Sequence, residues 1–334
     1  MAHARIALIR AVVLLLAVAA TACATALLAF VACGGDDTTN PPPESPPDLY
    51  GIGGWNEFDL FAVGDAGTIL HYKGLEWRSE ASPASSALRD VMGLSPSLAH
   101  AVGDGGTILR YNGTQWSKVV SPTTKALRSL WAVPPDNWLA VGAGGVVVAN
   151  NGSGWGEETS PTTQDLDGVW ALSGGEAYAV GNSGTVIHRT GGVWSTVTPF
   201  TSSRLRAVWA DKPGDWFAVG DAGEIWQERG AGWVPMSSPR MDDFYDVFGS
   251  DSAFVFAAGK ADSVLFYDGF DWRPIAPRFA GHLNAIWATI CALPPISSSS
   301  PEGLHCSNTY FAGTTSVLTR LTLLGTYEIM NDPR

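Results

Sequence analysis

A 39-residue repeat is the feature that most constrains the fold of this chain. Six glycines recur at that interval, namely Gly64, Gly103, Gly142, Gly181, Gly220 and Gly259. Six tryptophans keep the same interval, namely Trp77, Trp116, Trp155, Trp194, Trp233 and Trp272. A period of about 40 residues rich in Gly, Trp and β-branched residues is typical of propellers and other repeat arrays. The pattern therefore argues against a catalytic α/β domain.

One repeat divides into four short predicted strands. The first covers residues 205–210 and the second ends at 216–220, where the sequence reads Trp-Phe-Ala-Val-Gly. A Gly-containing turn at 221–223 leads to a third strand at 224–227, and the fourth opens at Trp233. The spaced glycines suit a tight hairpin, because positive φ costs glycine least. Strands with apolar residues on both faces must be covered by neighbouring sheets, which a closed ring provides.

We therefore expect an all-β fold, a seven-bladed β-propeller built from four-stranded antiparallel blades of 39 residues, over residues 49–334. The 39-residue interval is interrupted once. Gly313 follows Gly259 by 54 residues, an excess of 15 over the repeat. The excess coincides with a Pro- and Ser-rich stretch at residues 291–306, which we interpret as an insertion in the last blade.

The first 32 residues are typical of an export signal. Arg5 and Arg10 give a basic start, and an apolar run covers residues 11–32. The run ends in Phe-Val-Ala-Cys-Gly-Gly, which resembles the lipobox of bacterial lipoproteins, with Ala32 directly before Cys33. This resemblance implies a lipoprotein signal peptide over residues 1–32, cleavage before Cys33 and lipidation of its thiol.

Residues 33–48 follow as the lipidated cysteine and a disordered, Pro- and Asp-rich tether. The segment has no apolar periodicity and five prolines, so it should be solvated and partly polyproline. Its acidic stretch, without Asp directly after Cys33, resembles lipoproteins sorted to an outer membrane, periplasmic or surface-facing. Two alternatives stay open: cleavage before Cys23, and an uncleaved apolar run that acts as the anchor.

The cysteine count leaves two thiols in the body of the protein. Of the four cysteines, Cys23 falls in the signal and Cys33 carries the lipid. Cys291 and Cys306 then bracket the insertion, and two cysteines in an exported body indicate one disulfide. Two separate buried thiols are the alternative.

The charge balance excludes some partners. The formal net charge is −12, and charged residues make up only 16% of the chain. Sequence-independent phosphate binding needs clustered cations, so we expect no nucleic-acid partner. For the same reason we expect membrane contact through the lipid anchor only.

The turns between the third and fourth predicted strands suggest a family. Residues 72–77, 111–116 and 267–272 each run from Tyr through a Gly-containing turn to Trp. They resemble shortened Asp-box (BNR) turns, although only the Gly and the Trp recur regularly. The resemblance covers residues 49 to about 330 and extends to secreted propeller lipoproteins, including photosystem-assembly-factor-like seven-bladed propellers. It implies the fold rather than an activity, since these turns are structural.

Repeat position also predicts a binding face. In a propeller, the start of each first strand and the turn between second and third strands lie on one face, around the central channel. Arginines at one repeat position suggest a polar funnel there, able to bind a ligand. The candidate funnel residues are Arg89, Arg128, Arg204, Arg206, Tyr245, His282, Asp65, Asp104 and Asp221. The alternative is that these are freely varying loop positions that face water.

These observations favour a non-enzymatic binding or assembly module for a protein or glycan partner at the cell envelope. We expect a monomer, and we identify no catalytic residue, metal ligand or cofactor motif. The alternative is a sialidase-like glycoside hydrolase or glycan-binding propeller. Such an enzyme needs an arginine cluster for a carboxylate and a Tyr–Glu pair in one pocket.

The lipobox gives a direct test of export. Replacing Cys33 with Ser removes the thiol that would be acylated, so the variant should accumulate as unprocessed precursor. Metabolic labelling with a fatty acid and the mobility of the protein on a gel measure both steps. A variant that matures normally and still takes up label would contradict the assignment, and Cys23→Ser would be the next variant.

Overall fold

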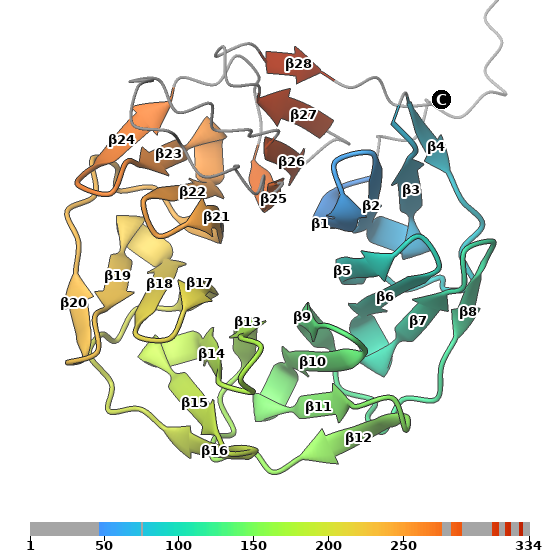
Figure 1. The fold of residues 1–334 in the computed structure, drawn as a ribbon, viewed down its shortest axis with the longest axis horizontal. Coiled ribbons are helices and arrows are strands. Elements are labelled where there is room, and N and C mark those ends of the chain that lie inside the picture. Colours follow the sequence, from blue (N-terminus) through green and yellow to red (C-terminus); the bar gives the residue numbers. More distant parts are fainter. Residues whose placement is uncertain are drawn as a thin grey trace, which may run out of the picture. The chain divides into compact units, whose positions relative to one another are not determined.

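The computed structural model describes residues 47–74, 76–275, 282–288, 309–313, 318–321 and 327–329, all within the unit Pro46–Arg334. Its strands form four-stranded antiparallel sheets arranged as blades around a central channel (Figure 1). The expected signal, the lipidated Cys33 and the expected disulfide between Cys291 and Cys306 lie outside the described residues. Within the described part, no helix is long and apolar enough to cross a membrane.

The strands of each blade follow the chain from the channel outward. The innermost strands are β1 (Leu49–Asn56), β5 (Leu88–Ser95), β9 (Leu127–Val133), β13 (Leu166–Ala171), β17 (Leu205–Lys212), β21 (Phe244–Asp251) and β25 (Leu283–Ala288). The second strands are β2 (Asp59–Gly64), β6 (Leu98–Gly103), β10 (Asn137–Gly142), β14 (Ala177–Gly181), β18 (Asp215–Gly220), β22 (Phe254–Gly259) and β26 (Thr309–Gly313). The third strands are β3 (Ile69–Tyr72), β7 (Ile108–Tyr111), β11 (Val147–Asn150), β15 (Val186–Thr190), β19 (Ile225–Glu228), β23 (Val264–Tyr267) and β27 (Leu318–Leu321). The outermost strands are β4 (Trp77–Ser79), β8 (Trp116–Lys118), β12 (Trp155–Glu158), β16 (Val193–Thr196), β20 (Trp233–Pro235), β24 (Trp272–Ile275) and β28 (Tyr327–Ile329).

Short 3-10 turns connect second to third strands. They are η2 (Asp65–Gly67), η3 (Asp104–Gly106), η4 (Ala143–Gly145), η5 (Asn182–Gly184), η6 (Asp221–Gly223) and η7 (Lys260–Asp262). All of them follow second strands, so they lie on the same face of the ring as the starts of the innermost strands. We call this the mouth face.

The expectation of seven blades of 39 residues requires a correction. Six blades, from β1–β4 to β21–β24, keep the repeat and are described with their side chains; we number them blade 1 to blade 6 in chain order. Strands β25–β28 pair as a further sheet, but it departs from the repeat because the extra residues fall between β25 and β26. The side chains of β27 and β28 lie outside the description. The fold is therefore six regular blades and a divergent closing sheet, not seven equivalent 39-residue blades.

The closing sheet completes the ring against blade 1. The Asn284 side-chain amide donates a hydrogen bond to the Leu49 carbonyl at 2.8 Å, and the Tyr310 hydroxyl donates to the Glu57 carbonyl at 3.0 Å. Leu49 and Leu283 also belong to one apolar cluster that runs from blade 5 through the closing sheet to blade 1. The first and last parts of the fold are thus held together by both polar and apolar contacts.

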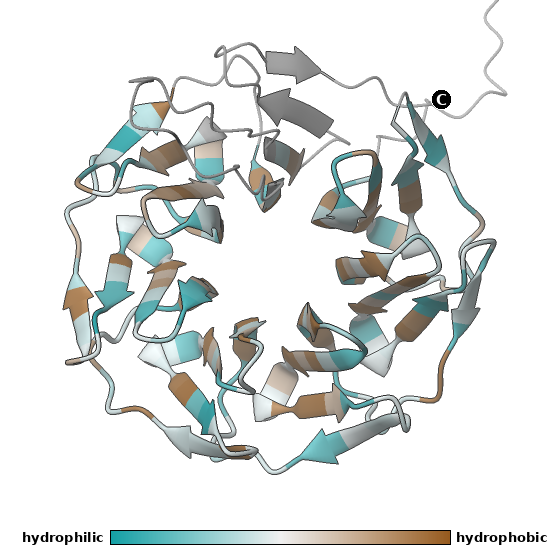
Figure 2. Cartoon of the chain, in the orientation of Figure 1, coloured by the Kyte–Doolittle hydropathy of each residue, from teal (hydrophilic) through white to brown (hydrophobic). Residues whose placement is uncertain are grey.

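Burial explains why these sequences form inner strands. Five consecutive residues of β2, from Leu60 to Gly64, are buried, and the other second strands of the regular blades repeat this pattern. A strand buried on both faces carries a continuous apolar run rather than an alternating one. Figure 2 shows the same gradient, with hydrophobic residues concentrated on inner strands while outer strands such as β12 and β16 are pale or hydrophilic.

The repeat tryptophans join each blade to the preceding one. Trp116 of blade 2 meets Phe61 of blade 1 edge to face at 5.0 Å between ring centroids, and Trp272 of blade 6 meets Phe217 of blade 5 at 6.2 Å. Trp155 of blade 3 contacts His100 of blade 2 at 5.5 Å. Four of the tryptophans are buried, namely Trp77, Trp116, Trp194 and Trp272, whereas Trp155 and Trp233 are half-buried.

The two glycines beside the first turn, Gly64 and Gly67, serve different purposes. Gly67 has a φ of +77°, where a side chain is strained. Gly64 has an extended backbone instead, with a φ of −166°. A Cβ on Gly64 would lie 2.0 Å from the Asp48 carbonyl oxygen, because the chain entering β1 passes directly over it. The glycines that recur every 39 residues are therefore required by a close approach of two backbone segments, not by a left-handed backbone conformation.

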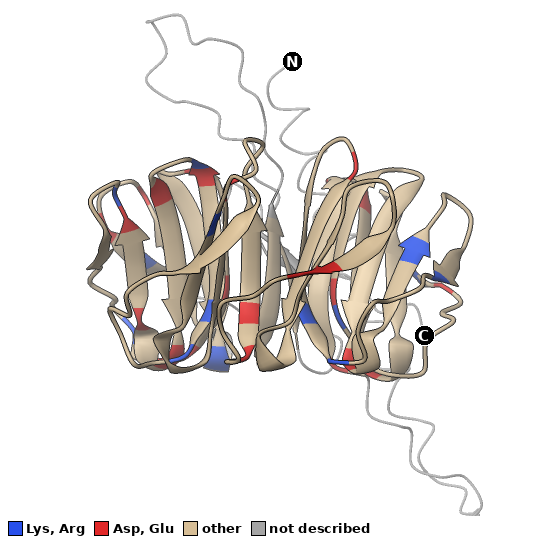
Figure 3. Ribbon diagram, turned by 90° about the horizontal axis from the view of Figure 1, so that it is seen from below, with Lys and Arg blue, Asp and Glu red and all other residues tan. Residues whose placement is uncertain are grey.

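Charges of both signs are interspersed over the described part of the ring. Figure 3 shows basic and acidic segments side by side along its edges, with the strands between them largely uncharged. Arginines on several blades pair with a nearby carboxylate, among them Arg89, Arg189 and Arg273. Charge is therefore concentrated in local pairs.

The tryptophan contacts predict a large stability effect. Truncating Trp116 to Ala deletes a buried aromatic between blades 1 and 2, which typically costs about 3–5 kcal/mol. The neighbouring change Gln115→Ala, at an exposed turn, should alter the unfolding free energy by less than about 0.5 kcal/mol. Urea unfolding of both variants measures the difference, and similar small effects would contradict the packing role.

Candidate functional site

A β-bulge near the start of each innermost strand directs one side chain to the mouth of the channel. In blade 1, Leu49 pairs with Gly64 and Gly51 pairs with Val63, which leaves Tyr50 as the extra residue. Bulges re-aim side chains and are common beside functional sites. The extra residues of the other innermost strands are Arg89, Arg128, Asp167, Arg206, Tyr245 and Asn284. All of these bulge residues line the mouth.

The structure brings the residues expected from the sequence together at this mouth, a cavity of ≈560 Å³. Seven of them line it directly: Arg89, Asp104, Arg128, Arg204, Arg206, Tyr245 and His282. Asp65 and Asp221 lie in the adjoining turns and contact lining residues, Tyr50 and Arg206 respectively. Repeat position was therefore sufficient to predict which side chains share this face.

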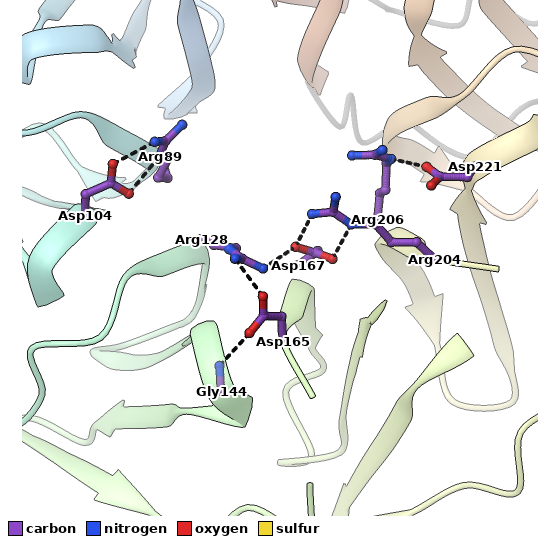
Figure 4. Close-up of polar contacts among 9 residues, drawn as sticks. All are labelled: Arg89, Asp104, Arg128, Gly144, Asp165, Asp167, Arg204, Arg206 and Asp221. Carbon is purple, nitrogen blue, oxygen red and sulfur yellow. Dashed lines mark hydrogen bonds and ion pairs between the residues drawn. The ribbon is translucent and has the colours of Figure 1, made fainter. Parts of the chain in front are cut away.

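Within a blade, the bulge residue bonds to the first residue of the following 3-10 turn. The Tyr50 hydroxyl donates to Asp65 Oδ1 at 2.8 Å. Arg89 donates to both carboxylate oxygens of Asp104, at 2.9 and 2.6 Å, and Arg206 donates to Asp221 (Figure 4). The Arg89 hydrogen bonds lower the pKa of Asp104, while burial and the bond to Asp65 raise the pKa of Tyr50 to about 12.

Blade 3 lacks a turn carboxylate, and its arginine reaches the next blade instead. Ala143 stands where the turns of blades 1, 2 and 5 have an aspartate, so Arg128 donates to Asp165 at 2.8 Å and to Asp167 at 3.0 Å. Arg204 donates twice to the same Asp167, at 2.7 Å each. Asp167 is only 7% exposed and lies between two guanidinium groups. A continuous ion-pair network thus links blades 3, 4 and 5 at the mouth (Figure 4).

Two arginines are also held against tyrosine rings. The Arg89 guanidinium carbon lies 4.6 Å from the centre of the Tyr50 ring, and that of Arg206 lies 4.9 Å from the Tyr245 ring. Cation–π contact and the ion pairs together fix the planes of these guanidinium groups. The side chains of Arg89 and Arg206 remain 34% and 23% exposed, so part of each guanidinium group faces the cavity.

Three of the residues that stand two positions before a bulge have a structural role that the sequence analysis missed. Asp165 accepts a hydrogen bond from the Gly144 backbone N–H at 2.7 Å, and Asp243 accepts one from Ala222 at 3.0 Å. A ring nitrogen of His282 accepts one from the Ala261 N–H at 3.1 Å. Each side chain caps the turn of the preceding blade, 21 residues earlier. The 21-residue separation follows from the repeat itself, so the sequence did not single out this contact.

Below the mouth, the channel narrows to a polar layer and then an aromatic one. Asp90 and Asp246 are half-buried. Each accepts a hydrogen bond from the next innermost strand, from Leu130 and Ile286 N–H respectively, at 2.7 Å. Burial raises the pKa of Asp90 to about 7 and that of Asp246 to about 8. These carboxyls therefore tend to hold a proton at neutral pH.

The aromatic layer closes the channel further from the mouth. Trp131 stacks on Trp170 with 3.4 Å between ring centroids, and both rings contact Phe248 from the far side, at 6.4 and 5.5 Å. Trp209 and Trp287 belong to the same repeat position and are buried. The mouth is therefore a cavity that is closed at its inner end. Such a cavity suits binding at the surface rather than passage of a polypeptide through the channel.

The sialidase-like alternative can be compared with the residues that line this mouth. No glutamate is among the residues that line it, so the Tyr–Glu pair of a sialidase-like enzyme is not formed by those residues. In the same described residues, no group of three or more His, Cys, Asp or Glu side chains is placed to hold a metal ion.

Comparison with solved structures identifies the chain as similar to known β-propellers. It matches YCF48 bound to a D1 peptide with a TM-score of 0.64 and 16% identity, over 86% of this chain and 93% of that one. It matches YCF48 from Cyanidioschyzon merolae with a TM-score of 0.63 and 17% identity, over 83% and 96%. The WD40 β-propeller domain of Doa1 gives a TM-score of 0.65 and 10% identity, over 82% and 92%.

At these identities the matches establish the propeller fold. They agree with the expected likeness to photosystem-assembly-factor propellers at the level of fold. No protein-family model matches the chain, and no curated protein does. Membership of an Asp-box or lipoprotein family is therefore not established.

The raised pKa of Asp246 predicts a pH dependence of stability. Between about pH 4 and pH 8 the folded state keeps the Asp246 proton that the unfolded chain has lost, so the unfolding free energy should fall as pH rises. Asp246→Asn should reduce that slope by up to about 1.4 kcal/mol per pH unit. Urea unfolding across this window measures both slopes.

The exposed change Asp271→Asn is the control and should leave the slope unchanged. His100, whose pKa burial lowers to about 4, contributes a slope of opposite sign below about pH 6.5, but it is present in every variant and cancels. Equal slopes for wild type and Asp246→Asn would show that Asp246 is ionised in the fold.

Proposed function

We propose that this chain is a non-catalytic binding module that recognises a carboxylate-bearing segment of a partner protein at the mouth of its channel. The observation that carries the proposal is the row of bulge residues, which places fixed arginines and tyrosines around one blind cavity. Planar guanidinium forks suit carboxylates because they can donate two parallel hydrogen bonds.

The mouth is organised before a ligand arrives. Arg89 and Arg206 are each held by a turn carboxylate and a tyrosine ring, so binding costs little side-chain entropy. The same aspartates balance the positive charge, which favours ligands that fit the donor geometry over polyanions in general. A peptide occupant is also in keeping with the structural neighbour that holds a D1 peptide, although that ligand belongs to the neighbour.

The proposal includes the cellular location. The chain is exported, and lipid on Cys33 ties it to the outer membrane by the tether up to residue 48. The lipobox-like sequence before Cys33 and the acidic, proline-rich residues after it support this part. The partner would then be a protein of the cell envelope.

The test begins with partner capture. Crosslinking from envelope membranes, with the propeller as bait, should recover a protein whose acidic peptides bind in fluorescence anisotropy. Arg206→Gln and Arg89→Gln each remove charge-assisted hydrogen bonds, which are worth about 1.5–3 kcal/mol, so binding of such a peptide should weaken by roughly ten-fold or more.

Arg273→Gln is the matched control, because Arg273 is 67% exposed on an outermost strand and pairs only locally with Asp268. It should bind like wild type. Equal affinities for all three variants would contradict the mouth as the binding site. Binding of sialic acid instead, with release of the sugar from a conjugate, would support the sialidase-like alternative.

A further inference from the structure

A second cavity opens on the face opposite the mouth, between blades 3 and 4. It has a volume of ≈590 Å³, within the range of about 300–1,000 Å³ that is usual for small-molecule sites. The adjoining ends of β9 and β10 and residues of the turns β11–β12 and β13–β14 surround its opening. Its apolar wall includes Leu139, Ala149 and Leu172, and its polar wall includes Asn137, Glu158 and Arg189. We call it the blade 3–4 pocket.

The repeat shows what normally fills this space. At the position of Ala149, the other regular blades carry large side chains: His71, Arg110, His188, Gln227 and Phe266. In blade 1 the His71 ring lies on Phe61, with 4.0 Å between ring centroids. In blade 4 the His188 ring stacks on Tyr178 at 4.1 Å. Blade 3 differs because Ala149 contributes no ring.

The repeat also shows how the ring is held. In blade 1, His71 Nε2 bonds to Asp59 at 2.7 Å and His71 Nδ1 bonds to Glu80 at 2.5 Å. In blade 4, His188 Nε2 bonds to Glu176 at 3.0 Å. An imidazole in this space is therefore recognised by an acceptor at the start of the second strand and, in blade 1, by a second acceptor just past the outermost strand.

Blade 3 keeps both acceptors although it lacks the ring. Asn137 occupies the position of Asp59 and Glu176, and Glu158 occupies the position of Glu80. Both line the pocket. Leu139 replaces Phe61 as the surface on which the ring would lie, and Gly156 replaces Arg78 on the adjoining outermost strand, which widens the opening.

The pocket walls are fixed by contacts across the two blades. Arg189 of blade 4 donates to Glu158 at 3.0 and 2.8 Å, and the Trp194 indole N–H donates to the same carboxylate at 2.6 Å. The Trp131 indole N–H donates to the Ala171 carbonyl at 3.0 Å. Glu158 is 21% exposed, so it is oriented but still reachable from the cavity.

We propose that the blade 3–4 pocket binds an imidazole ring, as carried by histidine. The ring would lie on Leu139 beside Ala149, in the place that His71 and His188 take in their own blades. Its N–H groups would face the Glu158 carboxylate and the Asn137 side-chain oxygen. The site is separate from the channel mouth and does not depend on the function proposed there.

The first measurement is saturation-transfer NMR with imidazole at about pH 8, where the ring is neutral. Wild type should transfer magnetisation to imidazole, and 1-methylimidazole, which has no N–H to donate when neutral, should bind several-fold more weakly. Ala149→His supplies the ring from the chain itself, so imidazole binding should weaken at least ten-fold. Free histidine and a histidine-containing peptide are then compared, and the tighter ligand identifies the source of the ring.

A second variant, which removes a histidine ring instead of adding one, tests the proposal even if Ala149→His does not fold. His188→Ala should open the equivalent space between blades 4 and 5, lower the melting temperature, and have that loss partly restored by imidazole. Phe266→Ala is the control, because its position has Phe254 in place of an acceptor, so imidazole should give no restoration. No imidazole signal with wild type, or an equal signal from wild type and Ala149→His, would overturn the proposal.

Discussion

The whole structure depends on the fact that no blade can cover its own faces. Each sheet buries its second strand on both sides, so its stability comes from the neighbours that flank it. The tryptophan at the start of each outermost strand makes this dependence specific, because it covers an aromatic or aliphatic residue of the preceding blade, as Trp116 covers Phe61. The ring is therefore a chain of nearest-neighbour contacts, and closure covers the two end faces that an open array would leave exposed.

Closure also determines the chemistry of the mouth. The innermost strands converge on the channel, and the bulge at the start of each one turns a side chain that would otherwise pack between blades toward the cavity. The partner of each arginine at the mouth then depends on the first residue of the turn in its own blade. Where the turn carries an acid, as at Asp104, the pair stays within the blade, and where it carries Ala143, Arg128 pairs with the next blade.

The repeat made much of this predictable. The interval between Gly64 and its equivalents predicted the four-stranded blades, although not that only six of them are regular. The position of Arg89 and its equivalents predicted which side chains share the mouth face. The repeat did not predict which side chains of adjacent blades contact each other. Asp165 capping Gly144 could not be recognised from one repeat, and the pocket beside Ala149 required knowledge of where the His71 ring lies. The period also could not reveal that the close approach over Gly64, not a positive φ, requires glycine there.

The bond from Asn284 to the Leu49 carbonyl has a mechanical consequence. Leu49 begins the first strand, and its backbone is held on one side by Gly64 of its own blade and on the other by the closing sheet. A pulling force on the preceding residues would therefore load the seam of the ring and blade 1 at the same time. A load applied at that end would therefore act first on the junction between β1 and β25, and opening that junction would expose apolar side chains that blade 1 and the closing sheet cover on each other.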